Sequence, residues 1–156
     1  MLDKFLLAFA LMAVCVALHA VGMITIVRWL RPRVRHGGRN FWISVGILIR
    51  LASWTIILHI SHIFVWGTAY AVFGAMPDFK TGLYFSAVTY TTTGYGDLVL
   101  THDWRVMGAI EALTGILMCG LSASMFFSFF SQLFALDRHA HSDSSAHENP
   151  AQRDPA

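Results

Sequence analysis

The residues best suited to a chemical task are five consecutive ones, Thr92-Thr93-Gly94-Tyr95-Gly96, which lie between two long apolar stretches. The two glycines lack a Cβ, so this strand can take backbone conformations that other residues disfavour. Successive carbonyl oxygens can then all face one axis. Four copies of the strand would stack rings of carbonyl oxygens, and a ring of Thr92 hydroxyls, that replace the water around a dehydrated monovalent cation. No charged side chain is needed for this chemistry.

The composition indicates that these residues belong to a membrane protein. Of the 156 residues, 56% are hydrophobic and the mean hydropathy is +0.57, whereas soluble domains are about 45–50% apolar. Only 13% of the residues are charged, and their uneven placement says more than the net charge of +2. Cys15 and Cys119 each lie within an apolar stretch, so we expect packing roles for them and no disulfide framework.

Three apolar runs are each long enough for the roughly 20 residues that span a bilayer. They predict an N-terminal transmembrane helix at 1–30, an outer helix at 41–75 and an inner helix at 104–136. A cleaved secretory signal is the competing interpretation of 1–30. Cleavage would leave the basic loop 31–40 on the outer side, against the positive-inside rule, so we favour a retained helix whose N-terminus is outside. The polar residues 137–156 predict a disordered, cytoplasmic tail.

A shorter segment, 80–91, lies between the second and third runs and cannot cross a bilayer as a helix. We expect a re-entrant pore helix, which is tolerated at membrane depth because neighbouring protein shields its backbone. Asp78 is suited to cap its first turn. Its C-terminal end would point toward the axis, where the negative end of the helix dipole favours a cation.

The stretch 92–97 resembles the selectivity filter of the potassium-channel superfamily, in the single-pore-loop branch common in prokaryotes. The family pattern is Thr-Val-Gly-Tyr-Gly, and Thr93 stands where valine is usual. Tyr95 is the more informative position, because in that superfamily an aromatic residue there goes with potassium preference and a carboxylate with weak selectivity. The resemblance covers residues 51–136 and says little about the residues before them.

The resemblance implies an all-α membrane protein with three transmembrane helices, a re-entrant pore helix and a selectivity filter, assembled as a homotetrameric pore. It would conduct K+ passively across the cell membrane, with no enzymatic activity, no cofactor, no nucleic-acid partner and no metal other than K+ in the filter. The ion would bind to Thr92, Thr93, Gly94, Tyr95 and Gly96. Because Thr93 departs from the family pattern, a weakly selective channel for Na+ and K+ is the first alternative.

Residues outside the filter are expected to support it. Asp97 would face the outer mouth, while Tyr84 and Phe85 resemble the aromatic packing that holds a family filter at fixed diameter; ordinary core packing is the alternative. In the family a pore-helix carboxylate pairs with this aspartate, but here Val88 stands at that position. Glu111 lies inside the inner helix and needs a partner in the membrane. We expect it to accept hydrogen bonds from the base of the pore helix or from the filter, with cation attraction as the alternative.

Two glycines of the inner helix, Gly115 and Gly120, are candidates for a gating hinge. Close packing against a neighbouring helix explains them equally well. Gly115 follows Glu111 at a Glu-x-x-x-Gly spacing that recurs in relatives.

Two histidines of the outer helix, His59 and His62, lie three residues apart and therefore share a face. Ionisable residues within a membrane are functional candidates by default. We favour structural hydrogen bonds across helices, with His19 on the first helix as the only evident partner. A haem- or metal-binding membrane protein that uses these three histidines is the alternative from another functional class.

Five arginines surround the first predicted loop, namely Arg28, Arg31, Arg33, Arg35 and Arg39. They predict that this loop is cytoplasmic. A surface for anionic lipid headgroups is a further interpretation, and a topology signal alone is equally consistent. A voltage sensor is disfavoured because Pro32 interrupts the helix.

Overall fold

The computed structural model describes residues 2–37 and 41–148, and the side chains of 2–34 and 41–133. Its elements, in chain order, are the helices α1 (Leu2–Gly37), α2 (Phe41–Val72) and α3 (Phe79–Tyr90), the short 3-10 helix η1 (His102–Trp104) and the helix α4 (Arg105–Glu148). These residues contain no strand. Segments long and apolar enough to cross a membrane lie within three of the helices, at Leu2–Val34, Phe41–Val72 and His102–Leu133. The predicted fold class, all-α with three transmembrane helices, is therefore confirmed.

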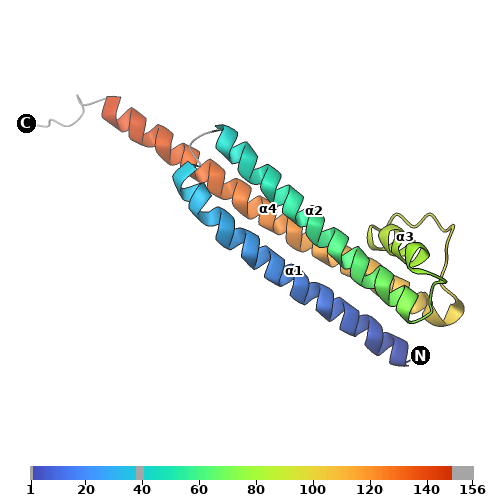
Figure 1. Cartoon of the computed structure of the whole chain (residues 1–156). Coiled ribbons are helices and arrows are strands. Elements are labelled where there is room, and N and C mark those ends of the chain that lie inside the picture. Colours follow the sequence, from blue (N-terminus) through green and yellow to red (C-terminus); the bar gives the residue numbers. More distant parts are fainter. Residues whose placement is uncertain (1, 38–40, 149–156) are drawn as a thin grey trace, which may run out of the picture.

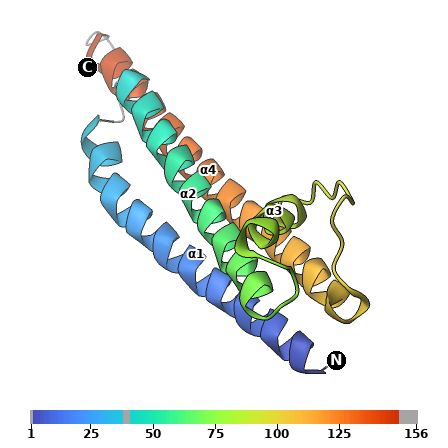
Figure 2. The same ribbon diagram turned by 45° about the vertical axis from the view of Figure 1, so that its right-hand side comes forward.

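The three long helices run side by side, and the short α3 lies beside one end of α2 and α4 (Figures 1 and 2). The N-terminus lies at the same end of the bundle as α3, and α4 ends at the opposite end. Contacts of Lys4 fix this arrangement at the start of α1. Its ammonium lies 4.3 Å from the ring centroid of Trp104 and 3.8 Å from the carboxylate of Asp103.

Helix α1 packs on α2 and α4 through one stripe of its surface. Its buried residues recur every three or four positions, which places them on a single face of a helix. From Cys15 onward they are Cys15, His19, Gly22, Ile26, Leu30 and Val34. The indole Nε1 of Trp54 on α2 donates to the Gly22 carbonyl of α1 at 2.9 Å. Leu58 occupies the space where a Gly22 side chain would lie, so the two helices approach closely at this point.

Two apolar clusters fill the bundle, one near each end. The cluster beside α3 includes the buried side chains of Cys15, Trp66, Tyr70, Phe85, Met107 and Ile110. The cluster at the far end includes Ile26, Leu30, Val34, Ile47, Leu51, Met125, Phe129 and Leu133. Between them, His19, His62 and Ser122 are buried polar residues. The apolar core is thus divided by a polar layer.

Helix α1 is longer than predicted, because it continues to Gly37 through Pro32. The expected loop at 31–40 is therefore helical at least to residue 37. A helix-interior proline costs about 3 kcal/mol, whereas full burial of one aliphatic side chain contributes about 1.5–3 kcal/mol. Leu30 and Val34, on either side of Pro32, are 0% and 4% exposed in the far cluster, so tertiary packing outweighs the proline. Arg39 lies outside the described residues.

Helix α4 also exceeds its predicted end. The backbone is helical to Glu148, although the polar residues from 137 onward were expected to be disordered. No glycine or proline occurs between Gly120 and Pro150, so nothing in this stretch interrupts the backbone hydrogen bonds of a helix. Residues 149–156 lie outside the described part of the chain.

The turn from α2 to α3 is built from a glycine and a helix cap. Gly74 has φ +71°, and the amide of Ala75 donates to the Tyr70 carbonyl at 2.9 Å, which ends α2 in a Schellman motif. Asp78 then caps α3, as predicted: its carboxylate accepts from the backbone N–H and the hydroxyl of Thr81 at 2.9 and 2.8 Å. These hydrogen bonds hold the pKa of Asp78 below its usual value.

Gly115 is a point of close helix packing. A Cβ at this position would overlap the carbonyl oxygen of Tyr90, the last residue of α3, whereas a Cβ at Gly120 meets no described atom within 4 Å. The structure therefore favours packing over a hinge for Gly115 and gives Gly120 no packing role within the protomer.

Gly115→Ala is predicted to destabilise the protein by about 1–3 kcal/mol, because the added methyl meets backbone that cannot move aside. Gly120→Ala is the matched control, since it adds the same methyl to the same helix in open space. The measurement is unfolding of the purified protein in detergent by a denaturant titration. Equal stability of the two variants would contradict the packing role.

Candidate ion-conduction site

The strand that follows α3 has an alternating backbone. Thr92, Gly94 and Gly96 have φ values of +58°, +58° and +76°, so every second residue is in the left-handed region. In a regular strand every residue has a negative φ. Here the sign of φ changes from one residue to the next, so the peptide groups are oriented differently from those of a regular strand. The two glycines led us to expect this geometry at positions 94 and 96. The left-handed Thr92 was not predicted.

Thr92 is left-handed because α3 ends in a Schellman motif at this residue. The Thr93 amide donates to the Val88 carbonyl at 3.0 Å, and the Thr92 amide donates to the Thr89 carbonyl at 2.9 Å. Helix α2 ends in the same motif, but there the left-handed residue is Gly74. An L-residue with a Cβ costs about 1–2 kcal/mol in this conformation. The first residue of the predicted filter is therefore strained.

The hydroxyl of Thr93 has a partner within the protomer. The Thr91 Oγ1 donates its only proton to the Ala87 carbonyl at 2.7 Å, and the Thr93 Oγ1 lies 2.9 Å from Thr91 Oγ1. Because the Thr91 proton is already used, Thr93 is the donor in the second bond. The side chain that replaces the family's valine is thereby attached to the end of the pore helix.

Asp97 is held by Tyr84. The phenol of Tyr84 donates to Asp97 Oδ2 at 2.7 Å, which joins α3 to the residue after the predicted filter. Behind the filter lies a cavity of about 210 Å³, lined by Tyr84, Phe85, Val88, Thr89, Gly94, Gly96, Asp97, Leu98 and Val99. Asp97 thus has a partner on α3, namely Tyr84. The family places its carboxylate partner one helical turn later, at the position of Val88.

Glu111 joins three helices. Its side chain is fully buried, and its two carboxylate oxygens accept from the hydroxyls of Tyr70 on α2 at 2.7 Å and Ser86 on α3 at 2.5 Å. We expected donors from the base of the pore helix or from the filter. The observed donors are the middle of the pore helix and the outer helix, and Tyr70 was not anticipated. A buried tyrosine hydroxyl usually has a partner, but sequence alone does not show which one.

The three histidines form a cluster with Tyr90 and Ser122. The ring centroids of His19 lie 5.7 and 5.3 Å from those of His59 and His62, and both His59 and His62 bond to the Tyr90 hydroxyl. In the described part of the chain, no group of three or more His, Cys, Asp or Glu residues could hold a metal ion. The arrangement is that of hydrogen-bonded side chains.

The strand itself faces away from its own protomer. All residues from Thr91 to Asp97 are exposed, and Tyr95 has 71% of its surface accessible. A Cβ at Gly94 or Gly96 would meet no described atom within 4 Å. The protomer thus presents the alternating backbone on an open surface.

The fold and this site define a multi-pass membrane protein with a re-entrant helix and an alternating strand after it. The model of one protein family, described as ion channel, matches residues 58–132. The match begins in α2, includes α3 and the strand, and ends in α4. No curated protein matches the chain, and no solved structure does. Residues 58–132 are therefore similar to an ion-channel family, and the similar region contains the whole of α3 and the alternating strand.

The hydrogen bonds of Glu111 are predicted to couple it energetically to the pore helix. In a double-mutant cycle of Ser86→Ala and Glu111→Gln, the interaction free energy should be about 0.5–3 kcal/mol, because each single substitution already removes the hydrogen bond that the two residues share, and the double substitution cannot remove it again. Denaturant unfolding of the detergent-solubilised protein measures it.

Ser61→Ala is the control for this cycle, since the Ser61 hydroxyl bonds only to the Ile57 carbonyl of its own helix. Its effect and that of Glu111→Gln should add within about 0.5 kcal/mol. Additive behaviour of Ser86 and Glu111 would show that the two residues do not stabilise each other.

Proposed function

We propose that the chain forms a homotetrameric channel that conducts K+ passively through the residues from Thr92 to Gly96. The observation that carries the proposal is the alternating backbone of Thr92, Gly94 and Gly96 directly after the end of a short, buried helix. Four such strands would surround an ion with backbone carbonyls in place of its hydration shell. The ion then moves from one ring of oxygens to the next.

The exposure of the strand supports the tetramer. One protomer can place carbonyl oxygens on only one side of an ion. The residues of its strand are exposed, and no described atom lies within 4 Å of a Cβ placed at Gly94 or Gly96. Symmetry-related copies supply the other sides and shield the same backbone from lipid, which a membrane requires. The C-terminal end of α3 carries partial negative charge and would favour a cation beside the filter.

The fixed hydroxyl of Thr93 favours K+ selectivity over the Na+/K+ alternative. A free hydroxyl at the valine position would add a mobile polar group behind the filter. Here it donates to Thr91, which in turn donates to the Ala87 carbonyl. Tyr84 fixes Asp97 in the same way at the other end of the strand. Both ends of the filter are thus tied to α3.

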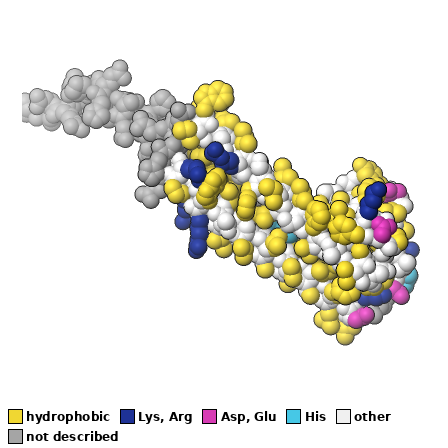
Figure 3. Space-filling view, in the orientation of Figure 1, with side chains coloured by type: hydrophobic (Ala, Val, Ile, Leu, Met, Phe, Trp, Pro, Cys, Tyr) yellow, Lys and Arg dark blue, Asp and Glu magenta, His cyan; other side chains and the backbone are white. Residues whose placement is uncertain are grey.

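The charged side chains support an orientation with the N-terminus outside and the C-terminus in the cytoplasm. On the face drawn in Figure 3, hydrophobic side chains cover the body of the bundle, and the described side chains at the end away from α3 include Lys and Arg but no Asp or Glu. The side chains of Arg28, Arg31 and Arg33 lie on α1 in this region. By the positive-inside rule, this end is cytoplasmic.

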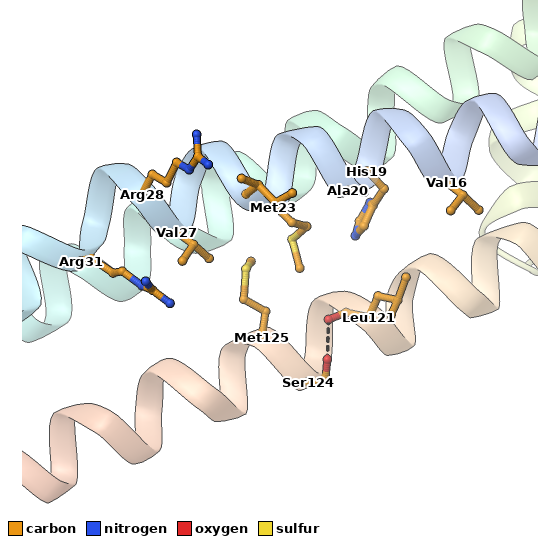
Figure 4. A pocket seen from close by; sticks show the side chains of 11 residues that line it. Val16, His19, Ala20, Met23, Val27, Arg28, Arg31, Leu121, Ser124 and Met125 are labelled. Atoms are coloured by element: carbon orange, nitrogen blue, oxygen red, sulfur yellow. Dashed lines mark hydrogen bonds between the residues drawn. The ribbon is translucent and has the colours of Figure 1, made fainter.

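A groove between α1 and α4 suits an anionic phospholipid as partner. It has a volume of about 520 Å³ and is lined mostly by apolar side chains, including those of Val16, Met23, Val27, Leu121 and Met125, with Arg28 and Arg31 at one end (Figure 4). An acyl chain would fill the apolar part while the two guanidinium groups bind the phosphate. Arg33, by contrast, stacks on Trp29 at 3.7 Å from the ring centroid and donates to the Trp29 carbonyl. The side chain of Arg35, like Arg39, lies outside what the structure describes.

Gly94→Ala is predicted to abolish selective conduction, because alanine disfavours φ +58° and a ring of four carbonyls would be displaced. In planar bilayers with K+ on one side and Na+ on the other, the wild-type current should reverse near the K+ equilibrium potential. The variant should give no selective current.

Gly74→Ala is the matched control, since it introduces similar strain, at φ +71°, in a turn away from the filter. It should lower stability and leave the reversal potential unchanged. A wild-type reversal near zero, or selective current through the Gly94 variant, would count against the proposed filter.

The double variant Arg28→Gln/Arg31→Gln is predicted to lose bound anionic phospholipid, by about fivefold per arginine, which corresponds to about 1 kcal/mol each. Mass spectrometry of lipids retained by the purified protein measures this. Arg33→Gln removes the same charge outside the groove and should retain the lipid. Equal retention by the two variants would mean that the groove does not bind it.

A further inference from the structure

Five polar side chains from all four α-helices form one hydrogen-bonded chain in the middle of the bundle. Its order is His19 (α1), Ser122 (α4), His59 (α2), Tyr90 (α3) and His62 (α2). The Ser122 Oγ lies 3.3 Å from His19 Nε2 and 3.2 Å from His59 Nε2, and the Tyr90 hydroxyl lies 2.9 Å from the Nδ1 atoms of both His59 and His62.

The protons of this chain can be counted. A neutral imidazole has one ring proton and a hydroxyl has one. His59 bonds through both nitrogens, so it donates at one and accepts at the other, and each hydroxyl likewise donates to one neighbour and accepts from the other. All four bonds therefore point the same way along the chain, and two opposite directions satisfy them equally.

The two ends of the chain are the unusual feature. His19 Nδ1 is buried and has no hydrogen-bond partner among the described residues, whereas His62 Nε2 is buried without a hydrogen bond of standard geometry but has the backbone of Cys15 facing its ring. In either direction, one of these two atoms carries a proton and the other has a lone pair that accepts from no donor; when His62 Nε2 carries the proton, the Cys15 backbone faces it. Buried polar groups without partners are uncommon and call for an explanation. Here the bare nitrogen is a basic site at which one further proton can bind.

We propose that this chain of five residues, from His19 to His62, is a binding site for a single proton, and that the bound proton reduces K+ conduction through the neighbouring filter. The proton forms an N–H bond at the bare end nitrogen and breaks none of the four hydrogen bonds. Transfer of one proton along each hydrogen bond then moves the positive charge to the histidine at the other end. It also reverses the donor and acceptor in all four hydrogen bonds. The chain of five residues gains one proton and one positive charge.

Tyr90 connects this site to the proposed filter. It is the last residue of α3, its hydroxyl is the link between His59 and His62, and its carbonyl contacts Gly115 of α4. A positive charge on the chain lies beside the C-terminal end of α3 and opposes the partial negative charge that favours a cation there. K+ is then bound less strongly at the inner end of the filter, so conduction falls as the proton binds.

Three other titratable groups face the chain. They are Cys15 on α1, whose backbone faces His62, and Glu111 and Cys119 on α4, which face Tyr90; on α2 the titratable groups are the two histidines themselves. The carboxylate of Glu111 is occupied by Tyr70 and Ser86. His19 also lines the groove between α1 and α4, together with Arg28 and Arg31 (Figure 4). This end of the chain is therefore the one next to the protein surface.

The test of the site itself is nitrogen NMR of the full-length protein, 15N-labelled at histidine, in lipid nanodiscs during a titration from basic to acidic pH. The ring nitrogens of His19, His59 and His62 should change together in one transition. His102 is the internal reference, because its side chain is 79% exposed and lies outside the chain of five residues. Ser122→Ala keeps all three imidazoles but cuts the chain, so His19 should then titrate separately from the other two.

Independent titration of the three histidines in the wild-type protein would overturn the site, as would spectra of all three that stay unchanged over the whole pH range. These readouts do not require conduction. The inference about conduction rests on the proposed function and is tested by K+ flux into liposomes as a function of pH.

The wild-type flux should fall through the same pH transition. His62→Gln keeps a neutral hydrogen-bonding side chain and should lose this pH dependence, whereas His102→Gln should retain it. A K+ flux that stays constant through the pH transition seen by NMR would overturn the coupling to the filter. If the three histidines change together in the NMR titration but neither the wild-type protein nor any variant conducts K+, the proposed function fails and the proton site stands.

Discussion

The contacts of one residue, Tyr90, determine where the proposed conduction strand lies. A helix as short as α3 cannot span a membrane, so its position depends on the protein around it. At its end, the Tyr90 carbonyl packs against Gly115, and the Tyr90 hydroxyl bonds to His59 and His62. Helices α2 and α4 thereby fix the residue that immediately precedes the alternating strand.

These contacts explain how the strand tolerates strain. Thr92 costs about 1–2 kcal/mol in the left-handed region, and the strand has no cover on its open side in the protomer. Net hydrogen bonds contribute about 0.5–1.5 kcal/mol each. Those from Thr93 to Thr91 and from Tyr84 to Asp97, with the Schellman bonds to Val88 and Thr89, therefore suffice to offset it. The backbone is held by α3 before any neighbouring copy contributes.

Much of the fold could be predicted from the sequence, because spans, caps and glycine positions are local signals. The segment 80–91 lies within one residue of α3, and Asp78 caps it as expected. Which side of each helix faces its neighbours could not be predicted. Membrane helices are apolar on all sides, so their sequences do not show how each helix is rotated about its own axis. For that reason Tyr70 and Ser122 were missed as partners of Glu111 and of the histidines. The continuation of α1 through Pro32 likewise depends on packing by Leu30 and Val34.

Helix α1 lies outside residues 58–132, which match the ion-channel family, yet its contacts join it to α2 and α4. Trp54 bonds to its backbone at Gly22, and His19 bonds to Ser122 of α4. The apolar clusters on both sides of this polar layer keep bulk water from it, which strengthens its hydrogen bonds and raises the cost of leaving any of them unmade. A shift of α1 along the bundle would break the hydrogen bond between His19 and Ser122. Through Ser122 and His59, such a shift would alter the hydrogen bonds of Tyr90, so α1 is linked by hydrogen bonds to the end of α3.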